Sequence, residues 1–319
     1  MDWPENLWYS PVKAFPQQRT ERTKILYEGE NSMRSKTLFA AVCFGVVFGL
    51  LMFVSGCQKQ DKATEQPAVT EGAAPSGEQA AAPGEEAAQP AEAGGVPKVV
   101  VVATDATWPP MEMLDANKNI IGFDIDFLNA VAKEAGFTVE FKNVAWDGIF
   151  GGLDTGNYHA VISSVTITDE RKQKYDFSEP YINAGQVLVV PKTAKGVKTL
   201  ADLKGKKVGA QIGTTGAMEV QKVKGIELKN YDEIGLAFED MAAGRVHGVV
   251  CDTPVAADYA LQRAEYKAKF MIVGEPFTKE QYGIVVKKGN KQLVDLLNKG
   301  IKAVQEKGID KELEKKWLR

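Results

Sequence analysis

From residue 98 onward, short apolar runs alternate with segments whose apolar residues recur at helical spacing. The valine-rich run 98–104 predicts a strand buried on both faces of a sheet. Over 124–135 the apolar residues share one stripe, and Gly136 follows as a C-terminal stop, so we expect a helix there. Next we expect strands over 138–141 and 159–165, with a short helix over 149–153 between them.

A second series of the same kind begins near Lys206. It predicts strands over 207–211, 226–231, 246–251 and 270–273, with helices after Gly213, over 233–243 and from about Pro254. A strand over 282–286 and two helical stretches complete the chain. Alternating strands and helices predict an α/β fold with mostly parallel sheets. A chain of 319 residues is long for one core, so we expect two lobes. Ligands bind beyond the carboxyl ends of such strands, which predicts a cleft between the lobes.

The front of the chain has the pattern of an export signal. Residues 37–54 are apolar and uncharged, Arg34 and Lys36 precede them, and Ser55-Gly56-Cys57 follows. A cysteine after small residues resembles the bacterial lipobox, so we expect 33–56 to be a lipoprotein signal peptide and Cys57 to carry the lipid. The alternative is an uncleaved transmembrane anchor, since the segment could almost span a bilayer. Either interpretation places the globular part outside the cytoplasm.

Two flanking segments fit no folded domain. Residues 1–32 precede a good signal-peptide start at Met33, and our hypothesis is that they are a mis-annotated extension. Residues 57–97 are rich in Ala, Glu, Pro and Gly and contain almost no large apolar side chain. Such a segment cannot bury enough surface to fold, so we expect a flexible tether.

Composition excludes several classes of function. The net charge of −3 gives no reason to expect nucleic-acid binding. Of the three cysteines, Cys43 and Cys57 belong to the front segment, which leaves Cys251 alone as a small buried filler. His159 and His247 are far apart, so a zinc site is not expected and neither is a cofactor.

Several motifs occur in a fixed order along residues 98–319, and together they are far more specific than any one of them. They are ATDATWPP at 103–110, GFDID at 122–126, WDGI at 146–149, SSVTITDER at 163–171, DFSEPY at 176–181, GTTG at 213–216 and DTP at 252–254. In this set the chain resembles the amino-acid-binding periplasmic proteins of ABC importers, in the cluster of glutamine, histidine and lysine/arginine/ornithine receptors.

The resemblance implies a type II periplasmic-binding-protein-like fold with a ligand cleft and a two-strand hinge. Lobe 1 would comprise 98–185 and 281–319, and lobe 2 would comprise 186–280. The crossings near 184–187 and 276–282 would act as hinges, because a few residues there absorb the closing motion.

The resemblance also implies partners for each end of a free amino acid. Arg171 would grip the carboxylate with two parallel hydrogen bonds, assisted by Thr166 and by Thr215 at a helix N-terminus. Asp252, the Ser164 carbonyl and the Thr166 hydroxyl would hold the ammonium. On the residues alone, the stretch around Arg171 also reads as a helix cap and a solvated turn, and the glycine-rich turn reads as a plain turn.

The side chain of the ligand would lie between Trp108 and Trp146, with Asp105 facing its tip. The related glutamine receptor has a lysine at the position of Gln211 and a histidine at that of Cys251. Loss of those groups favours a cationic ligand, arginine first and then lysine or histidine, over glutamine. The complete ligand-binding set that we expect is Asp105, Trp108, Trp146, Ser163, Ser164, Thr166, Arg171, Gln211, Thr214, Thr215 and Asp252.

The expected partners are a free amino acid, an ABC permease complex in the inner (cytoplasmic) membrane, and the membrane itself through the lipid anchor. We expect a monomer in the periplasm or on the outer face of the cell membrane. A glutamine receptor, a periplasmic enzyme such as a cyclohexadienyl dehydratase, and the sensory domain of a receptor or kinase are the alternatives. Catalysis needs an acid or base beside a reacting carbon, whereas the polar groups above are all assigned to holding a zwitterion, so we do not expect an enzyme.

Overall fold

The computed structural model describes residues 97–318. The expected extension 1–32, the signal segment 33–56, Cys57 and the tether up to residue 96 lie outside the described residues. Within 97–318, no helix is both long and apolar enough to cross a membrane.

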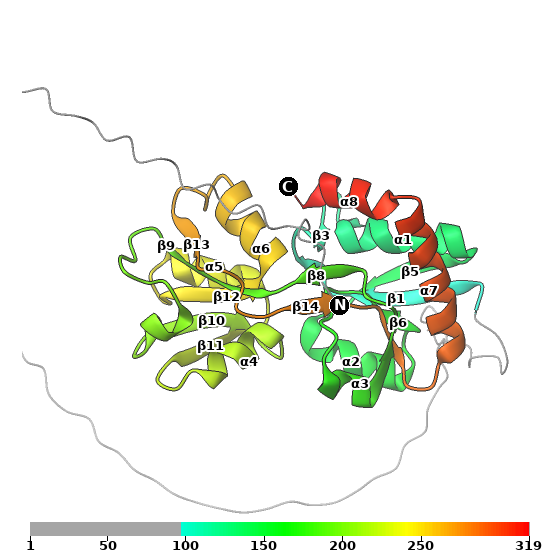
Figure 1. The fold of residues 1–319 in the computed structure, drawn as a ribbon, viewed down its shortest axis with the longest axis horizontal. Helices are drawn as coiled ribbons and strands as arrows, with labels where there is room; N and C mark the ends of the chain where they lie inside the picture. The colour runs from blue at the N-terminus through cyan, green and yellow to red at the C-terminus, as the bar shows by residue number, and fades with distance from the viewer. Residues whose placement is uncertain (1–96, 319) are drawn as a thin grey trace, which may run out of the picture. The chain divides into compact units, whose positions relative to one another are not determined.

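The first lobe is a five-stranded mixed sheet with helices on both faces (Figure 1). Its strands, in spatial order, are β5 (Thr138–Asn143), β1 (Val99–Thr104), β6 (Ala160–Val161), β15 (Val285–Lys287) and β7 (Tyr175–Phe177). The first three are parallel, and β15 runs antiparallel to both of its neighbours. Its helices are α1 (Phe123–Ala135), α2 (Trp146–Thr155), α3 (Asp169–Lys174), α7 (Lys291–Glu306) and α8 (Ile309–Trp317).

The second lobe repeats this plan with another five-stranded sheet. Its strands, in spatial order, are β11 (Glu227–Tyr231), β10 (Lys207–Gln211), β12 (Gly248–Asp252), β9 (Gln186–Pro191) and β13 (Phe270–Val273). Strand β9 is antiparallel to both of its neighbours. The covering helices are α4 (Thr215–Lys222), α5 (Ile234–Ala242) and α6 (Thr253–Ala257).

Alternation along the central strands explains why both faces of each sheet are covered. In β1, Val100 and Val102 belong to the apolar cluster that contains the buried residues of α1 and α7, whereas Ala103 belongs to the cluster of α2. In β12, Val249 and Cys251 face one cluster and Val250 faces the other. Successive side chains of a strand point to opposite faces, so a strand covered on both sides needs an unbroken apolar run.

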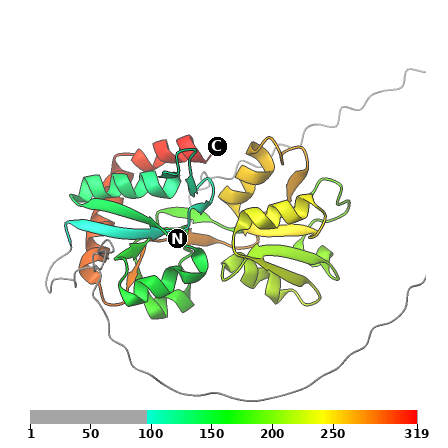
Figure 2. The same ribbon diagram turned by 180° about the vertical axis from the view of Figure 1, so that it is seen from behind.

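Two antiparallel strands connect the lobes, as the two opposite views show (Figures 1 and 2). They are β8 (Ile182–Ala184) and β14 (Glu280–Tyr282). A small three-stranded sheet, β2 (Thr107–Trp108), β3 (Glu112–Leu114) and β4 (Ile120–Ile121), lies beside α1 in the first lobe.

Three sequence expectations need correction. The sheets are mixed rather than mostly parallel, because the strand that follows each hinge crossing, β9 in the second lobe and β15 in the first, runs antiparallel to both of its neighbours. The strand expected over 282–286 is two strands, β14 in the hinge and β15 in the first lobe. The strand expected over 159–165 is only β6, because Ser164 has a φ of 49° and turns the chain out of the sheet.

Candidate functional site

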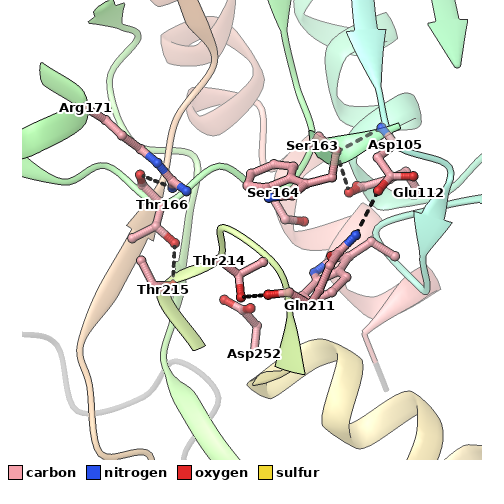
Figure 3. A pocket seen from close by; sticks show the side chains of 12 residues that line it. Asp105, Glu112, Ser163, Ser164, Thr166, Arg171, Gln211, Thr214, Thr215 and Asp252 are labelled. Atoms are coloured by element: carbon pink, nitrogen blue, oxygen red, sulfur yellow. Dashed lines mark hydrogen bonds between the residues drawn. The ribbon is translucent and has the colours of Figure 1, made fainter. Parts of the chain in front are cut away.

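All eleven residues predicted from the sequence line one pocket between the lobes, together with Glu112, which was not predicted (Figure 3). They come from the carboxyl ends of strands in both lobes and from the loops and helix starts that follow. Asp105 follows β1, Gln211 and Asp252 end β10 and β12, and Thr215 begins α4. The cavity measures about 20 Å³, which is room for about one water molecule. In this arrangement of the lobes the cavity is too small for an amino acid.

One end of the pocket is built around Asp105, which is 4% exposed. The backbone N–H of Asp105 donates to Ser163 Oγ at 3.0 Å, and Ser163 Oγ donates to Glu112 Oε1 at 3.0 Å. Across the cleft, Gln211 Nε2 donates to Asp105 Oδ2 at 3.1 Å. Burial raises the pKa of Asp105, and the hydrogen bonds from Thr107 and Gln211 oppose that rise. A carboxylate in this setting gains free energy from any cation that enters the pocket.

Behind this end lies a pair of fully buried carboxyl groups, Glu112 and Asp124. Asp124 Oδ2 accepts from Ser164 N at 2.8 Å and from the Tyr181 hydroxyl at 2.9 Å, which holds the turned backbone of Ser164 in place. Burial raises the pKa of Asp124 to about 6, and burial together with Asp124 raises the pKa of Glu112 well above its usual value. Glu112 escaped prediction because an isolated glutamate in a short strand has no local pattern that distinguishes it from an exposed one.

The other end of the pocket carries the guanidinium of Arg171, which is half-buried. Its Nη1 donates to the carbonyl of Thr166 at 2.9 Å, and its Nη2 donates across the cleft to the carbonyl of Gly213 at 3.4 Å. The guanidinium carbon lies 5.5 Å from the ring centre of Trp146 and 5.4 Å from that of Phe150, within the range of cation–π attraction. Burial lowers the pKa of Arg171, whereas Glu280 and Asp252 raise it, so it remains a cation.

Asp252 is 5% exposed and accepts a 2.6 Å hydrogen bond from the hydroxyl of Tyr282 at its Oδ1. Burial, and after it the nearby Glu280, raise the pKa of Asp252 to about 7, although Tyr282 and Arg171 oppose that rise. The carboxyl is therefore poised between its neutral and ionised forms at neutral pH. An entering ammonium group would favour the ionised form.

The pocket can thus hold a small zwitterion by charge and hydrogen bonding. Arg171 supplies the cationic group, and Asp105 and Asp252 supply carboxyl groups at separate places. Among residues 97–318, no group of three or more histidine, cysteine or acidic side chains is arranged to hold a metal ion.

Residues 100–319 match the bacterial extracellular solute-binding proteins, family 3. The chain belongs to this family. Among its relatives, a probable histidine-binding protein of Neisseria gonorrhoeae is 40% identical over 66% of this chain and 80% of its own length. An L-cystine-binding protein of Escherichia coli is 34% identical over 69% of this chain and 82% of its own length.

Solved structures of amino-acid-binding proteins share the fold of this family 3 member. An ancestral arginine-binding protein bound to arginine has a TM-score of 0.67 and 42% identity, over 70% of this chain and 99% of the other. The same kind of ancestral protein bound to glutamine gives 0.66 and 43%, over 70% and 98%. The ancestral amino acid-binding protein AncCDT-1, a precursor of cyclohexadienyl dehydratase, gives 0.65 and 37%, over 70% and 96%. These matches establish the two-lobed type II fold.

The raised pKa of Asp252 predicts how the stability of the ligand-free protein depends on pH. The folded state holds this proton up to about pH 7 and the unfolded chain releases it near pH 4, so the contribution of Asp252 to stability falls as pH rises through that window. Relative to Asp252→Asn, the free energy of unfolding should fall by about 2–4 kcal/mol between pH 4.5 and pH 8. Urea unfolding of both proteins measures it, and parallel pH curves would refute the assignment.

Proposed function

We propose that this chain is the substrate-binding lipoprotein of an ABC importer. It captures a free amino acid by closing its lobes and delivers it to the permease complex in the inner (cytoplasmic) membrane. Membership of solute-binding family 3 and the amino-acid-binding names of its relatives support the first part of this proposal. Within it, Arg171 and the backbone N–H groups at the start of α4 bind the ligand carboxylate, and Asp252, the Ser164 carbonyl and the Thr166 hydroxyl bind the ammonium.

The ligand that the pocket favours is a basic amino acid, arginine first and then lysine or histidine. The observation that carries this choice is the accumulation of buried acidic groups at the side-chain end, where Asp105 and Glu112 line the pocket without a cationic partner among the pocket residues. A cationic tip would neutralise them, and Trp108 and Trp146 would enclose its stem. Relatives whose names specify histidine or arginine agree with this choice.

Two other functions have a specific observation in their favour. A neutral ligand is supported by the Gln211 amide, which already satisfies one oxygen of Asp105, and by the ancestral protein with bound glutamine. An enzyme on this fold is suggested by AncCDT-1 as a precursor of a dehydratase. Incubation with prephenate or arogenate distinguishes such an enzyme from a binding protein, because a binding protein yields no product.

A thermal-shift screen of residues 58–319 against the common amino acids and cystine tests the ligand class. A ligand present at one hundred times its dissociation constant adds about 2.7 kcal/mol to the free energy of unfolding. We expect arginine, lysine or histidine to give the largest shift. Cystine or glutamine as the best ligand would overturn the basic specificity, and no shift with any amino acid would overturn the proposed function.

Two substitutions separate the ends of the pocket. Arg171→Ala removes the only guanidinium of the site and should weaken every amino acid by 100-fold or more, since a bidentate charged contact is lost (roughly 3 kcal/mol). Asp105→Asn keeps the shape but removes a charge, so it should weaken arginine by about 10-fold or more and leave glutamine nearly unchanged. Calorimetric titration measures both. An equal loss for arginine and glutamine in Asp105→Asn would contradict the role of Asp105.

The lipid anchor is tested at Cys57, which follows the small residues of the expected signal. Cys57→Ser removes the thiol that would carry the lipid, so the protein should no longer incorporate an alkyne-labelled fatty acid supplied to the cells. Cys43→Ser, in the apolar segment, is the matched control and should still be labelled. If the unaltered protein took up no fatty acid, an uncleaved transmembrane anchor would be the better explanation.

A further inference from the structure

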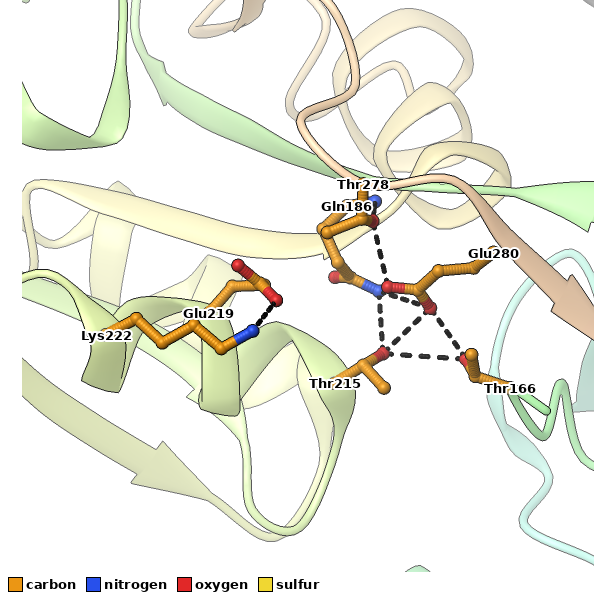
Figure 4. Close-up of polar contacts among 7 residues, drawn as sticks. All are labelled: Thr166, Gln186, Thr215, Glu219, Lys222, Thr278 and Glu280. Atoms are coloured by element: carbon orange, nitrogen blue, oxygen red, sulfur yellow. Dashed lines mark hydrogen bonds and ion pairs between the residues drawn. The ribbon is translucent and has the colours of Figure 1, made fainter. Parts of the chain in front are cut away.

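Glu280, on the hinge strand β14, joins hydroxyl groups of both lobes (Figure 4). It is 8% exposed and does not belong to the residues that line the pocket. Its Oε2 accepts from Thr166 Oγ1 of the first lobe at 2.7 Å and from Thr215 Oγ1 of the second lobe at 2.9 Å. Its Oε1 accepts from Thr278 Oγ1 at 2.8 Å. An acidic side chain in the hinge thus lies directly behind two residues of the pocket.

These contacts fix where the hydroxyl protons point. A threonine hydroxyl has one proton, and an ionised carboxylate can only accept a hydrogen bond. The hydroxyls of Thr166 and Thr215 therefore both donate their hydrogen bond to Glu280. The two hydroxyl oxygens lie 3.5 Å apart. Each hydroxyl oxygen then has lone pairs but no free proton, so it can only accept a hydrogen bond from any further group that approaches it.

A buried amide reinforces this direction at Thr215. Gln186 is fully buried, and its Nε2 donates to Thr215 Oγ1 at 3.1 Å and to Glu280 Oε2 at 3.3 Å. An amide oxygen in that place would face the carboxylate, so the NH₂ group is the one that fits. Space is tight around this amide, since a Cβ at Gly216 would lie 2.7 Å from Gln186 Oε1. Thr215 therefore accepts from Gln186 and donates to Glu280.

The charges nearby agree with an acceptor role. Glu280 and Asp252 interact as like charges, and Arg171 is the cation that faces both. An ammonium group brings three donors and one positive charge to such a place. A ligand carboxylate would instead meet hydroxyl lone pairs backed by a carboxylate, which is repulsive.

We propose that Glu280 is a positioning residue that turns the Thr166 and Thr215 hydroxyls into acceptors for the α-ammonium of the ligand. The ligand carboxylate is then left to Arg171 and to the backbone N–H groups at the start of α4. This assignment rests on the proposed function. It gives a physical cause for the expected contact of the Thr166 hydroxyl with the ammonium, and it adds the Thr215 hydroxyl, until now assigned with α4 to the carboxylate, as a second acceptor.

The test compares an amino acid with its analogue that lacks only the α-ammonium. For arginine the analogue is 5-guanidinopentanoate, and the probe pair is chosen from the best ligand of the thermal-shift screen. Glu280→Gln keeps the size of the side chain but lets its NH₂ donate to a threonine, which turns that hydroxyl proton toward the pocket. Calorimetric titration should show the amino acid weakened by about 10- to 100-fold and the analogue changed by less than about threefold.

Control variants isolate the effect. Glu219→Gln makes the same charge change on α4, where Glu219 pairs with Lys222 outside the pocket, and it should leave both affinities unchanged. Thr215→Val removes the newly assigned acceptor without changing the charge and should reproduce the selective loss of the amino acid, as Thr166→Val should at the expected one. Circular dichroism melting curves establish that each variant is folded before titration. If Glu280→Gln does not fold, Thr215→Val provides the test.

The possible outcomes distinguish failure of the proposed function from failure of the role assigned to Glu280. If the unaltered protein binds no amino acid, the proposed function fails and this assignment fails with it. If it binds an amino acid but the variants weaken the amino acid and the analogue equally, Glu280 has a structural role only and the assignment is overturned. If Glu280→Gln binds the amino acid more tightly, the hydroxyls serve the carboxylate, which also overturns it.

Discussion

Burial of carboxyl groups with too few cations is the constraint on which the rest of this pocket depends. Asp105, Glu112 and Asp252 line the cavity, and Glu280 lies just behind it, whereas Arg171 is the one cationic side chain among the lining residues. An unpaired buried charge is costly, and the group responds by a raised pKa or by taking up a partner. The raised pKa values of Asp105, Glu112 and Asp252 are the first response. A ligand that carries positive charge is the second.

The same constraint applies to the contacts that cross between the lobes. Gln211 donates a hydrogen bond to Asp105, and Arg171 donates one to the carbonyl of Gly213. Glu280 accepts a hydrogen bond from one threonine hydroxyl of each lobe. A ligand shifts the equilibrium between open and closed lobes only by binding the closed form better than the open one. The contacts that these groups make to a ligand must therefore be stronger than the hydrogen bonds between the lobes that the ligand replaces. In the proposed function, charged contacts to Asp105 and Asp252 would provide that difference, because a neutral amide such as that of Gln211 stabilises a buried charge less than a cation does.

Local sequence patterns predicted most of the fold because they report on burial directly. The valine run became β1 and the apolar stripe after Gly122 became α1, since both patterns are decided by which faces are covered. The family resemblance carried by the ordered motifs also implied eleven site residues, and the fold brings all of them to one pocket. The shortened strand β6 was missed, because the turn at Ser164 is held by Asp124, forty residues away in sequence. Glu112 and Glu280 were missed for the same kind of reason: only tertiary contacts determine that a glutamate is buried.

Those two missed glutamates occupy equivalent roles at opposite ends of the pocket. Glu112 accepts the proton of Ser163, and Glu280 accepts the protons of Thr166 and Thr215. In each case a carboxyl behind a pocket hydroxyl leaves that hydroxyl with lone pairs to offer, so both ends present acceptors. An amino acid with a neutral side chain carries one cationic group and would satisfy one end. A basic amino acid carries two, separated by an apolar stem that suits the indoles of Trp108 and Trp146, and this match of two acceptor ends with two cationic groups is the physical argument for a basic ligand.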